Sequence, residues 1–415
     1  MEPYISKKLD TRRSPRHLFG LKGKRVTQRV TFNPSTARPG ETLYVNVPVL
    51  PTDTVLVPNA IALVATFTLS GTGRHANNRA VQNLGRALVA RRVVRVGDKE
   101  LESLARPDLV ELYADLWRPK EERTHLVEQG IQTVEVAKHR SAAGDKNTSV
   151  AGDISLAAAF PKYRIPLDGQ GALEIFRTHG ALPTKDLPEI RIEVTLAPAT
   201  DVIVSSDPTK VGTYLLENIV LEYQTIEPDV RSTILNAPPR LLFNHITHHA
   251  TITFDRTAQP VLSDAIQIQR RSFVGLLGLF VTPHTAGARD TEAFQDPGIS
   301  KVEFNIDGQS NVLYQHGMLP SDLWASALSG AEWLLGVSEK RAERPDGFSL
   351  SKYAMCIDLR TARDSLVHGD GRNSIGPGRN IQYRIHRSGG TGNCALHLYI
   401  LSEGAFELDE DELYK

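Results

Sequence analysis

Apolar and polar residues alternate with a period of two through most of this chain of 415 residues. The segment 190–196 is the clearest case, because four aliphatic side chains alternate there with Arg, Glu and Thr. Successive side chains of a β-strand point to opposite faces of the sheet, so this period predicts half-buried strands. The same pattern recurs in residues 43–49, 61–69, 219–223, 250–254, 302–306, 381–385 and 396–400. We therefore expect an all-β protein built as a sandwich.

Turn signals separate these segments. Asp-Gly pairs occur at 168–169, 307–308, 346–347 and 370–371, and Gly97-Asp98 lies between Val96 and Leu101. Such pairs adopt the backbone conformations that tight hairpins require.

Only two stretches have the 3.6-residue period of an amphipathic helix. In residues 109–117 the apolar side chains follow Asp108, which we expect to cap the helix, and in residues 323–333 they follow Ser321, which we expect to cap the second one. All three tryptophans, Trp117, Trp324 and Trp333, fall in these two stretches. We expect the indoles to pack in a core or at an interface rather than to bind a ligand.

The two helical stretches share a context that indicates an internal duplication. Each follows a strand, a Gly-Asp or Asp-Gly turn and a second strand, and each contains the triplet Asp-Leu-Trp, at 115–117 and at 322–324. The triplets lie 207 residues apart, which is half the chain. We interpret the chain as one β-sandwich present twice.

This duplication leads to predicted domain boundaries. We expect a basic N-terminal arm at 1–24, a first sandwich at 25–227, a proline-containing linker at 228–239, a second sandwich at 240–405 and an acidic C-terminal tail at 406–415. The linker is placed where consecutive prolines, Pro238-Pro239, cannot continue a ladder.

A strand-rich unit of this size, with one helix in a long connection between strands, is typical of an eight-stranded jelly roll. Two in tandem resemble the double jelly-roll major capsid proteins of double-stranded DNA viruses. Segments similar to those of adintovirus-like and Polinton-related capsid proteins are residues 216–223, 248–253, 270–277, 285–290 and 358–360, and the resemblance covers most of residues 40–402.

The resemblance implies a non-enzymatic capsid protein without a cofactor. Its three copies would form a homotrimer with a pseudo-hexagonal outline, and these capsomers would tile an icosahedral shell together with penton and minor capsid proteins. The protein would be assembled inside the host cell and reside in the virion capsid. Two Arg-Asp pairs, Arg289-Asp290 and Arg363-Asp364, are candidates for buried structural ion pairs or for contacts between subunits. We favour an interface, since arginine suits bidentate contacts with carboxylates.

Charge is balanced overall, with 48 basic and 48 acidic residues, but it is uneven at the two ends. Residues 1–29 hold nine basic and two acidic side chains, and residues 403–415 hold six acidic and one basic. Lys7, Lys8, Arg12, Arg13 and Arg16 of the arm are candidates for contact with neighbouring subunits or packaged DNA, and the alternative is that both termini only aid solubility. The overall balance argues against a protein whose main task is to coat nucleic acid.

The apolar runs and the cysteine content argue against a membrane-spanning or secreted protein. The longest apolar run, at 274–281, is far shorter than the ~20 residues that a transmembrane helix needs, and the N-terminus has no apolar core of signal-peptide length. Two cysteines, Cys356 and Cys394, cannot form a disulfide framework. We expect a soluble protein that folds inside the cell.

The sequence does not predict a catalytic, metal or cofactor site. His245, His248 and His249 are the best candidate cluster, but on a strand His245 and His249 would lie ~13 Å apart and His248 would point the other way, so one metal ion would not join them. The phosphate-binding loop, the dinucleotide fingerprint and the Gly-x-Ser-x-Gly motif are all missing. The acidic run 409–412 lies in the terminal tail, where nothing positions a substrate.

Two other functions stay open. A carbohydrate-binding or glycan-processing sandwich would have an aromatic-lined groove with a pair of carboxylates ~5–10 Å apart, yet the tryptophans fall on helices. A nucleic-acid-binding protein would depend on the basic arm alone, and removal of residues 1–29 would then abolish binding of DNA without affecting oligomerisation.

Overall fold

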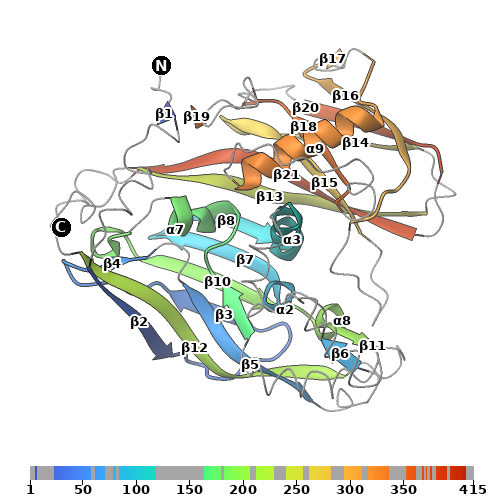
Figure 1. Ribbon diagram of the computed structural model, residues 1–415. Coiled ribbons are helices and arrows are strands. Elements are labelled where there is room, and N and C mark those ends of the chain that lie inside the picture. The colour runs from blue at the N-terminus through green and yellow to red at the C-terminus, as the bar shows by residue number, and fades with distance from the viewer. Residues whose placement is uncertain are drawn as a thin grey trace. The chain divides into compact units, whose positions relative to one another are not determined.

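The computed structural model places two compact units (Figure 1). It describes residues 5–6, 23–57, 61–70, 78–80, 84–117, 163–178, 182–205, 212–228, 240–255, 261–281, 294–310, 316–335, 352–360, 367–368, 371, 374–375, 380–389 and 393–407. One unit consists of Leu9–Phe243, His284–Thr291 and Ala405–Lys415, and the other of Met1–Lys8, Asn244–Pro283 and Glu292–Gly404.

The first half of the chain forms two antiparallel sheets. One has the order β2-β12-β5-β9, with the short β4 also paired to β12, and the other has the order β3-β10-β7-β8. The strands are β2 (Gly23–Thr31), β3 (Thr42–Asn46), β4 (Val55–Leu56), β5 (Ala62–Ser70), β7 (Val89–Val96), β8 (Lys99–Ala105), β9 (Tyr163–Pro166), β10 (Ile190–Leu196) and β12 (Thr213–Pro228). A small sheet pairs β6 (Asn78–Ala80) with β11 (Ile203–Ser205). The short helices are α2 (Leu84–Ala87), α3 (Pro107–Leu116), α7 (Ile175–Thr178) and α8 (Ala199–Val202), with 3-10 turns η3 (Gly171–Glu174) and η4 (Thr184–Asp186).

The second half repeats this arrangement. Its sheets have the orders β13-β21-β15-β18 and β14-β20-β16-β17. The strands are β13 (Arg240–Asp255), β14 (Val261–Gln267), β15 (Phe273–Val281), β16 (Ile299–Ile306), β17 (Gln309–Ser310), β18 (Ala354–Asp358), β20 (Asn380–Arg387) and β21 (Asn393–Glu407), and the helix is α9 (Pro320–Leu335). A separate two-stranded sheet pairs β1 (Ile5–Ser6) with β19 (Val367–His368).

When the eight main strands of each half are numbered along the chain, both halves have one sheet in the order 1-8-3-6 and one in the order 2-7-4-5. Among the residues that the structure describes, the longest helix of each half, α3 or α9, lies between the fifth and the sixth strand. This is the jelly-roll topology. The prediction of an all-β chain with two tandem eight-stranded jelly rolls, each with a helix in a long connection, is confirmed.

The alternating apolar side chains of the strands form the core of the first jelly roll. In β10 the residues Ile190, Ile192, Val194 and Leu196 are buried and the residues between them are half-buried. Strand β3 ends earlier than the pattern 43–49 predicts, at Asn46, and Val49 is exposed. The loop at Asp168-Gly169, which was predicted to be a hairpin turn, leads instead from β9 into the helical turns η3 and α7.

In the second jelly roll, two central strands are buried on both faces. Every residue of β15 from Phe273 to Phe280 is buried, and β21 has a similar run from Cys394. Helix α9 packs on β18, the strand next to β15 in this sheet (Figure 1), and the close approach of Gly330 to Cys356 leaves no space for a side chain at position 330. The sulfur of Cys356 would lie only 2.7 Å from a Cβ atom there.

Both predictions of a helix-capping residue are wrong, because Asp108 and Ser321 lie inside their helices and not at the N-cap position. Helix α3 begins at Pro107, and its N-cap is Arg106 in a left-handed conformation with no side-chain cap. Proline has a preset φ angle and no N–H group, which suits the first helical position. Asp108 therefore lies inside the first turn and accepts hydrogen bonds from the Arg106 guanidinium at 3.0 and 3.1 Å.

The second helix starts in the same way. Helix α9 begins at Pro320, so Ser321 is already helical, and the carboxylate of Asp322 accepts a hydrogen bond from the backbone N–H of Leu319 at 2.9 Å. The helices start 213 residues apart, whereas the Asp-Leu-Trp triplets lie 207 apart. Asp115 is near the end of α3 and Asp322 is in the first turn of α9, so the triplets are not structurally equivalent even though the strands around them are.

Candidate functional site

The predicted contact residues are placed only in part. Lys7, Lys8, Arg12, Arg13 and Arg16 of the basic arm and the pairs Arg289-Asp290 and Arg363-Asp364 lie outside the described residues. Trp117 and Trp333 are buried, and Trp324 is half-buried. The ring of Trp117 lies edge-on to Tyr113, with ring centroids 6.1 Å apart. The second strand of the repeated context, which we expected at 311–314 before the second helix, also falls outside the described residues, apart from β17 just before it.

The three histidines of β13 contact different partners. His245 Nδ1 lies 3.2 Å from Ser402 Oγ, His248 Nε2 lies 3.4 Å from His397 Nδ1, and His249 Nε2 lies 3.8 Å from Asp264 Oδ2. His397, on β21, was not predicted, because nothing in the sequence indicates which strand pairs with β13. Within the described ranges, no group of three or more His, Cys, Asp or Glu side chains is arranged to hold a metal ion.

His245 makes the second jelly roll sensitive to acid. Burial, together with the nearby charge of Arg270, lowers the pKa of His245 to about 4 from its ordinary 6.5. The unfolded chain therefore binds a proton more readily than the folded chain, and the folded state loses stability as the pH falls from 6.5 towards 4. We expect a loss of about 1–3 kcal/mol across this window, and the variant His245→Gln should flatten it.

Chemical denaturation at a series of pH values measures this effect. The matched control is His249→Gln, an exposed position on the same strand, which should keep the slope of the unaltered protein. A His245→Gln protein with an unchanged slope would show that another group causes the acid sensitivity.

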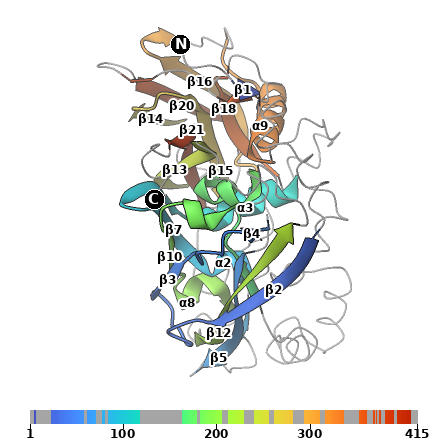
Figure 2. The same cartoon turned by 90° about the vertical axis from the view of Figure 1, so that its left-hand side faces the viewer.

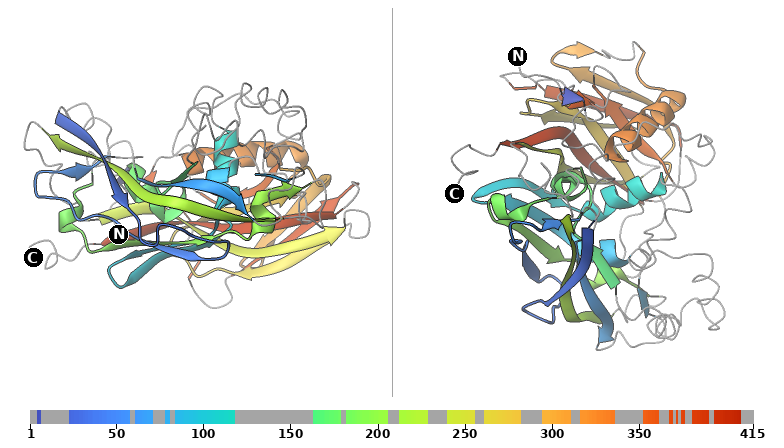
Figure 3. Two further views of the ribbon diagram at one scale, coloured as in Figure 1. Left: turned by 90° about the horizontal axis from the view of Figure 1, so that it is seen from below. Right: turned by 60° about the vertical axis from the view of Figure 1, so that its left-hand side comes forward.

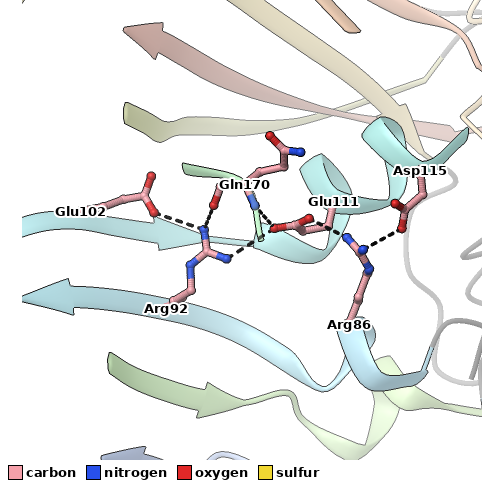
Figure 4. Close-up of polar contacts among 6 residues, drawn as sticks. All are labelled: Arg86, Arg92, Glu102, Glu111, Asp115 and Gln170. Carbon is pink, nitrogen blue, oxygen red and sulfur yellow. Dashed lines mark hydrogen bonds and ion pairs between the residues drawn. The ribbon is translucent and has the colours of Figure 1, made fainter. Parts of the chain in front are cut away.

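A chain of buried charges connects α3 to the sheet of the first jelly roll (Figure 4). Arg86 of α2 contacts two carboxylates of α3, at 2.5 Å from Glu111 and 2.9 Å from Asp115. Burial alone lowers the pKa of Arg86, but Asp115 and Glu111 outweigh burial, so the pKa lies above its ordinary value. The guanidinium is thus fixed in its charged form.

Arg92 of β7 continues the chain on the other side of Glu111. It lies 3.5 Å from Glu111 and 3.2 Å from Glu102 of β8, and it donates a hydrogen bond to the carbonyl oxygen of Gln170. The backbone N–H of Gln170 in turn donates to Glu111 (Figure 4). Side chains from α2, β7, β8 and α3 and the backbone of one loop therefore meet in a single network.

Two glycines let this loop approach the carboxylates. A Cβ atom at Gly169 would lie 1.9 Å from Glu111 Oε1, and one at Gly171 would lie 2.2 Å from Glu102 Oε1. Gly171 also has a φ of +78°, which favours glycine. The Asp-Gly-Gln-Gly sequence, which was predicted to form a hairpin turn, thus forms a loop that packs closely against the carboxylates of the network.

The sequence analysis missed this network. Its signal was a pair of carboxylates at i and i+4 of a helix, Glu111 and Asp115, which resembled a solvated face. In the structure every residue of α3 is buried, so the polar side of the helix faces arginines and not water.

The second jelly roll holds α9 with a different set of groups. Asp358, at the end of β18, lies 2.8 Å from the Nη2 of Arg360 and accepts a hydrogen bond from the Ser329 hydroxyl of α9 at 2.6 Å. Burial raises the pKa of Asp358, but Arg360 and Ser329 outweigh it and the pKa lies below its ordinary value. Ser326 of α9 also donates to the carbonyl oxygen of Cys356.

The network at Glu111 has no room for a substrate. The space beside Arg86, Arg92 and Glu111 has a volume of about 20 Å³, which is enough for about one water molecule. Each charged group in it faces an opposite charge, so none is presented to a ligand.

A larger hollow of about 600 Å³ lies on the outer face of β14, β20 and β16. Its aromatic residues, Phe304 and Tyr383, have their side chains buried. Its Glu303 accepts hydrogen bonds from Lys301 and His386, which lower the pKa of the carboxyl to about 2. A glycosidase needs a carboxylic acid with a raised pKa, and Glu303 has the opposite shift. Neither the groove nor the acid of a glycan-processing site is formed here.

Among the described residues, no helix is both long and apolar enough to span a membrane.

Comparison with known proteins identifies the fold. No protein-family model and no curated protein matches the chain. Solved structures do match. The Faustovirus major capsid protein is 10% identical, with a TM-score of 0.55 over 94% of this chain and 91% of its own. The Sputnik virophage structure is 11% identical, with a TM-score of 0.53 over 92% and 87%. The PBCV-1 virus capsid model is 11% identical, with a TM-score of 0.50 over 92% and 94%.

These matches span nearly the full length of each chain, at an identity that carries information on fold alone. With its two strand orders each present twice, the chain has the double jelly-roll fold of these viral capsid structures.

Proposed function

We propose that this chain is the major capsid protein of a double-stranded DNA virus, related to the adintovirus-like and Polinton group. Three copies form a homotrimer, and the trimers tile an icosahedral shell around the DNA together with penton and minor capsid proteins. The protein is assembled inside the host cell and has no enzymatic role. The observation that carries the proposal is the repetition of one jelly-roll topology within one chain.

The repetition has a direct consequence for assembly. Three copies of a chain with two similar bodies place six similar bodies around one axis, and such a near-hexagonal ring tiles a surface. Closed rings are the usual outcome when identical subunits associate through a fixed rotation. The Faustovirus and PBCV-1 chains with the same fold are capsid proteins by name, which supports the same role here.

The buried networks fit a load-bearing role. Both long helices are held to their jelly rolls by charged or hydroxyl groups with fixed geometry, at Glu111 in the first and at Asp358 and Ser329 in the second. Packed interiors resist compression and transmit strain. A tile that must keep its shape in a shell needs this rigidity and needs no catalytic residue.

The termini and the remaining predicted contact residues take roles consistent with this function. We assign 1–24 to a basic arm, 25–227 and 240–405 to the two jelly rolls, 228–239 to the linker and 406–415 to an acidic tail, with the ends of β2, β12 and β21 reaching one or two residues beyond these bounds. Trp324, Arg289, Asp290, Arg363 and Asp364 are assigned to contacts between subunits. The basic arm reaches neighbouring subunits or DNA, and this role is best tested by replacing Lys7, Lys8, Arg12, Arg13 and Arg16 with glutamine, because the change leaves β1 (Ile5–Ser6) and β2, which starts at Gly23, in place.

Light scattering and negative-stain electron microscopy of the purified protein test the proposal. We expect the mass of a trimer, with hexagonal capsomers or capsid-sized particles in the micrographs. A strictly monomeric protein at micromolar concentration, with no particles, would contradict it. A glycan-binding protein would instead retain a defined oligosaccharide, and we expect none to bind.

A further inference from the structure

Strand β2 is an edge strand that is buried on neither face. It pairs with β12 over its whole length, from Gly23 opposite Pro228 to Thr31 opposite Val220, and it is the outermost strand in the sheet order. None of its nine residues is buried. Figures 2 and 3 show β2 alongside β12 at the margin of their sheet, and the far end of β12 also pairs with β4 on its other side, at Thr225 and Ile226.

This exposure is unusual for the first strand of a jelly roll. Val30 lies opposite Leu221 and Gln28 lies opposite Tyr223, and both partner residues on β12 are buried. The side chain of Val30 is nevertheless 48% exposed. The equivalent first strand of the second jelly roll, β13, contains fully buried residues such as Ile246. A long exposed edge of this kind is a template for pairing with another chain, unless something covers it.

The exposed strand is basic. Lys24, Arg25 and Arg29 project from it, and it contains no acidic residue. Arg29 contacts Glu222 of β12 at 2.8 Å but keeps 67% of its side chain exposed. Glu222 is shared with Arg164 of β9, which lies 2.5 Å away, so the pair does not neutralise the edge. Glu227 lies opposite Lys24, so the paired stretch of β2 and β12 holds three basic and two acidic side chains, an excess of one positive charge.

The chain itself contains a segment of the opposite charge and of suitable length. Residues 409–412 are Asp-Glu-Asp-Glu, in the eight residues 408–415 that follow β21. As an extended segment these eight residues cover about 26 Å, against about 30 Å for the nine residues of β2. Charge is therefore complementary between the exposed edge and residues 409–412.

We propose that β2 binds the acidic C-terminal segment of a second copy of this chain. The proposal deepens the proposed function and rests on it for the presence of that second copy. Identical subunits that each offer one edge and one tail can exchange them around a closed ring or across a seam. The contact is held by exposed charges, so it is weakened by salt and can be broken and re-formed while a shell corrects errors.

Charge reversal in two separate chains tests the exchange. The first variant carries Lys24→Glu, Arg25→Glu and Arg29→Glu, and the second carries lysine at positions 409, 410, 411 and 412. Each variant alone should need a protein concentration at least about tenfold higher to associate than the unaltered protein, because several ion pairs turn repulsive. Mixed together, the two variants should associate at a lower concentration than either variant alone, since each supplies the partner that the other lacks. Recovery is partial in a ring of three, where only two of the three contacts can join unlike variants.

Light scattering at about 0.05 M and 0.5 M NaCl, within the range over which exposed charges are screened, measures the association. The matched control reverses three exposed arginines elsewhere, Arg91, Arg271 and Arg384, and should associate normally. Circular dichroism and thermal unfolding confirm that each variant is folded.

The outcomes separate this inference from the function on which it rests. If folded variants assemble like the unaltered protein, or if the mixture associates no better than either variant alone, the exchange between copies is overturned while the capsid function stands. If the unaltered protein never associates, the capsid function fails with it.

Discussion

Replacing Glu111 with glutamine is expected to lower the free energy of unfolding of the first jelly roll by about 3–5 kcal/mol. Glu111 contacts both arginines of the buried network, Arg86 at 2.5 Å and Arg92 at 3.5 Å. Glutamine has nearly the same shape but no charge, so two guanidinium groups would share fewer counter-charges in a buried site. Removal of one member of a buried ion pair is costly because the other charge stays desolvated.

The matched control is Glu100→Gln on the neighbouring strand. Glu100 lies 2.7 Å from Arg95, but the two side chains are 43% and 37% exposed. Water replaces the lost partner there, and we expect a change below about 1 kcal/mol. Denaturation followed by fluorescence of Trp117, with Trp324 and Trp333 replaced by phenylalanine in every variant, reports on the first jelly roll. Equal losses from Glu111→Gln and Glu100→Gln would mean that burial does not decide the strength of these pairs.

The fold was largely predictable from the sequence because burial on one face imposes a period of two. The alternation in 190–196 corresponds to β10, and the one in 302–306 falls in β16. Helices were found where the period changes, at α3 and α9. The order of the strands within each sheet was not derivable from these patterns, since the first and the last strand of each half pair across most of that half.

The errors in the sequence analysis have local physical causes. Pro107 and Pro320 start their helices one residue earlier than the expected capping positions, because proline suits the first helical turn. The two Asp-Leu-Trp triplets have the same sequence but lie at different positions within their helices. Strand β21 has both faces buried, so its alternation understates its burial.

The buried network could not be predicted for a different reason. Glu111 and Asp115 have the spacing of a solvated helix face, and only the tertiary structure brings Arg86 and Arg92 against them. The close approach of Gly169 and Gly171 to these carboxylates likewise depends on a loop from a distant part of the chain. The local sequence pattern predicts the helices and strands, whereas contacts of this kind depend on how those helices and strands pack together.

Replacing Asp358 with asparagine is expected to destabilise the second jelly roll by about 3–5 kcal/mol, for a related reason. Both carboxylate oxygens are used: Oδ1 accepts from the backbone N–H and the Nε of Arg360, and Oδ2 accepts from the Ser329 hydroxyl. The variant deprives buried Arg360 of its carboxylate and weakens the attachment of α9 to β18. The smaller change Ser329→Ala leaves the ion pair in place and should cost about 1 kcal/mol.

The pH dependence identifies the charge as the cause. Because the pKa of Asp358 in the folded protein lies below its ordinary value of 3.8, its contribution is present above that value and is lost as the pH falls below it. Asp358→Asn should therefore remove part of the acid-induced loss of stability, whereas Ser329→Ala should keep most of it. Glu303→Gln, at a more exposed pair with Lys301 on the same jelly roll, should change stability at pH 7 by less than about 1 kcal/mol. Denaturation at pH 7 and at pH 3 distinguishes these cases, and an Asp358→Asn protein as stable as the Glu303→Gln protein at pH 7 would contradict a role for the buried pair in holding α9.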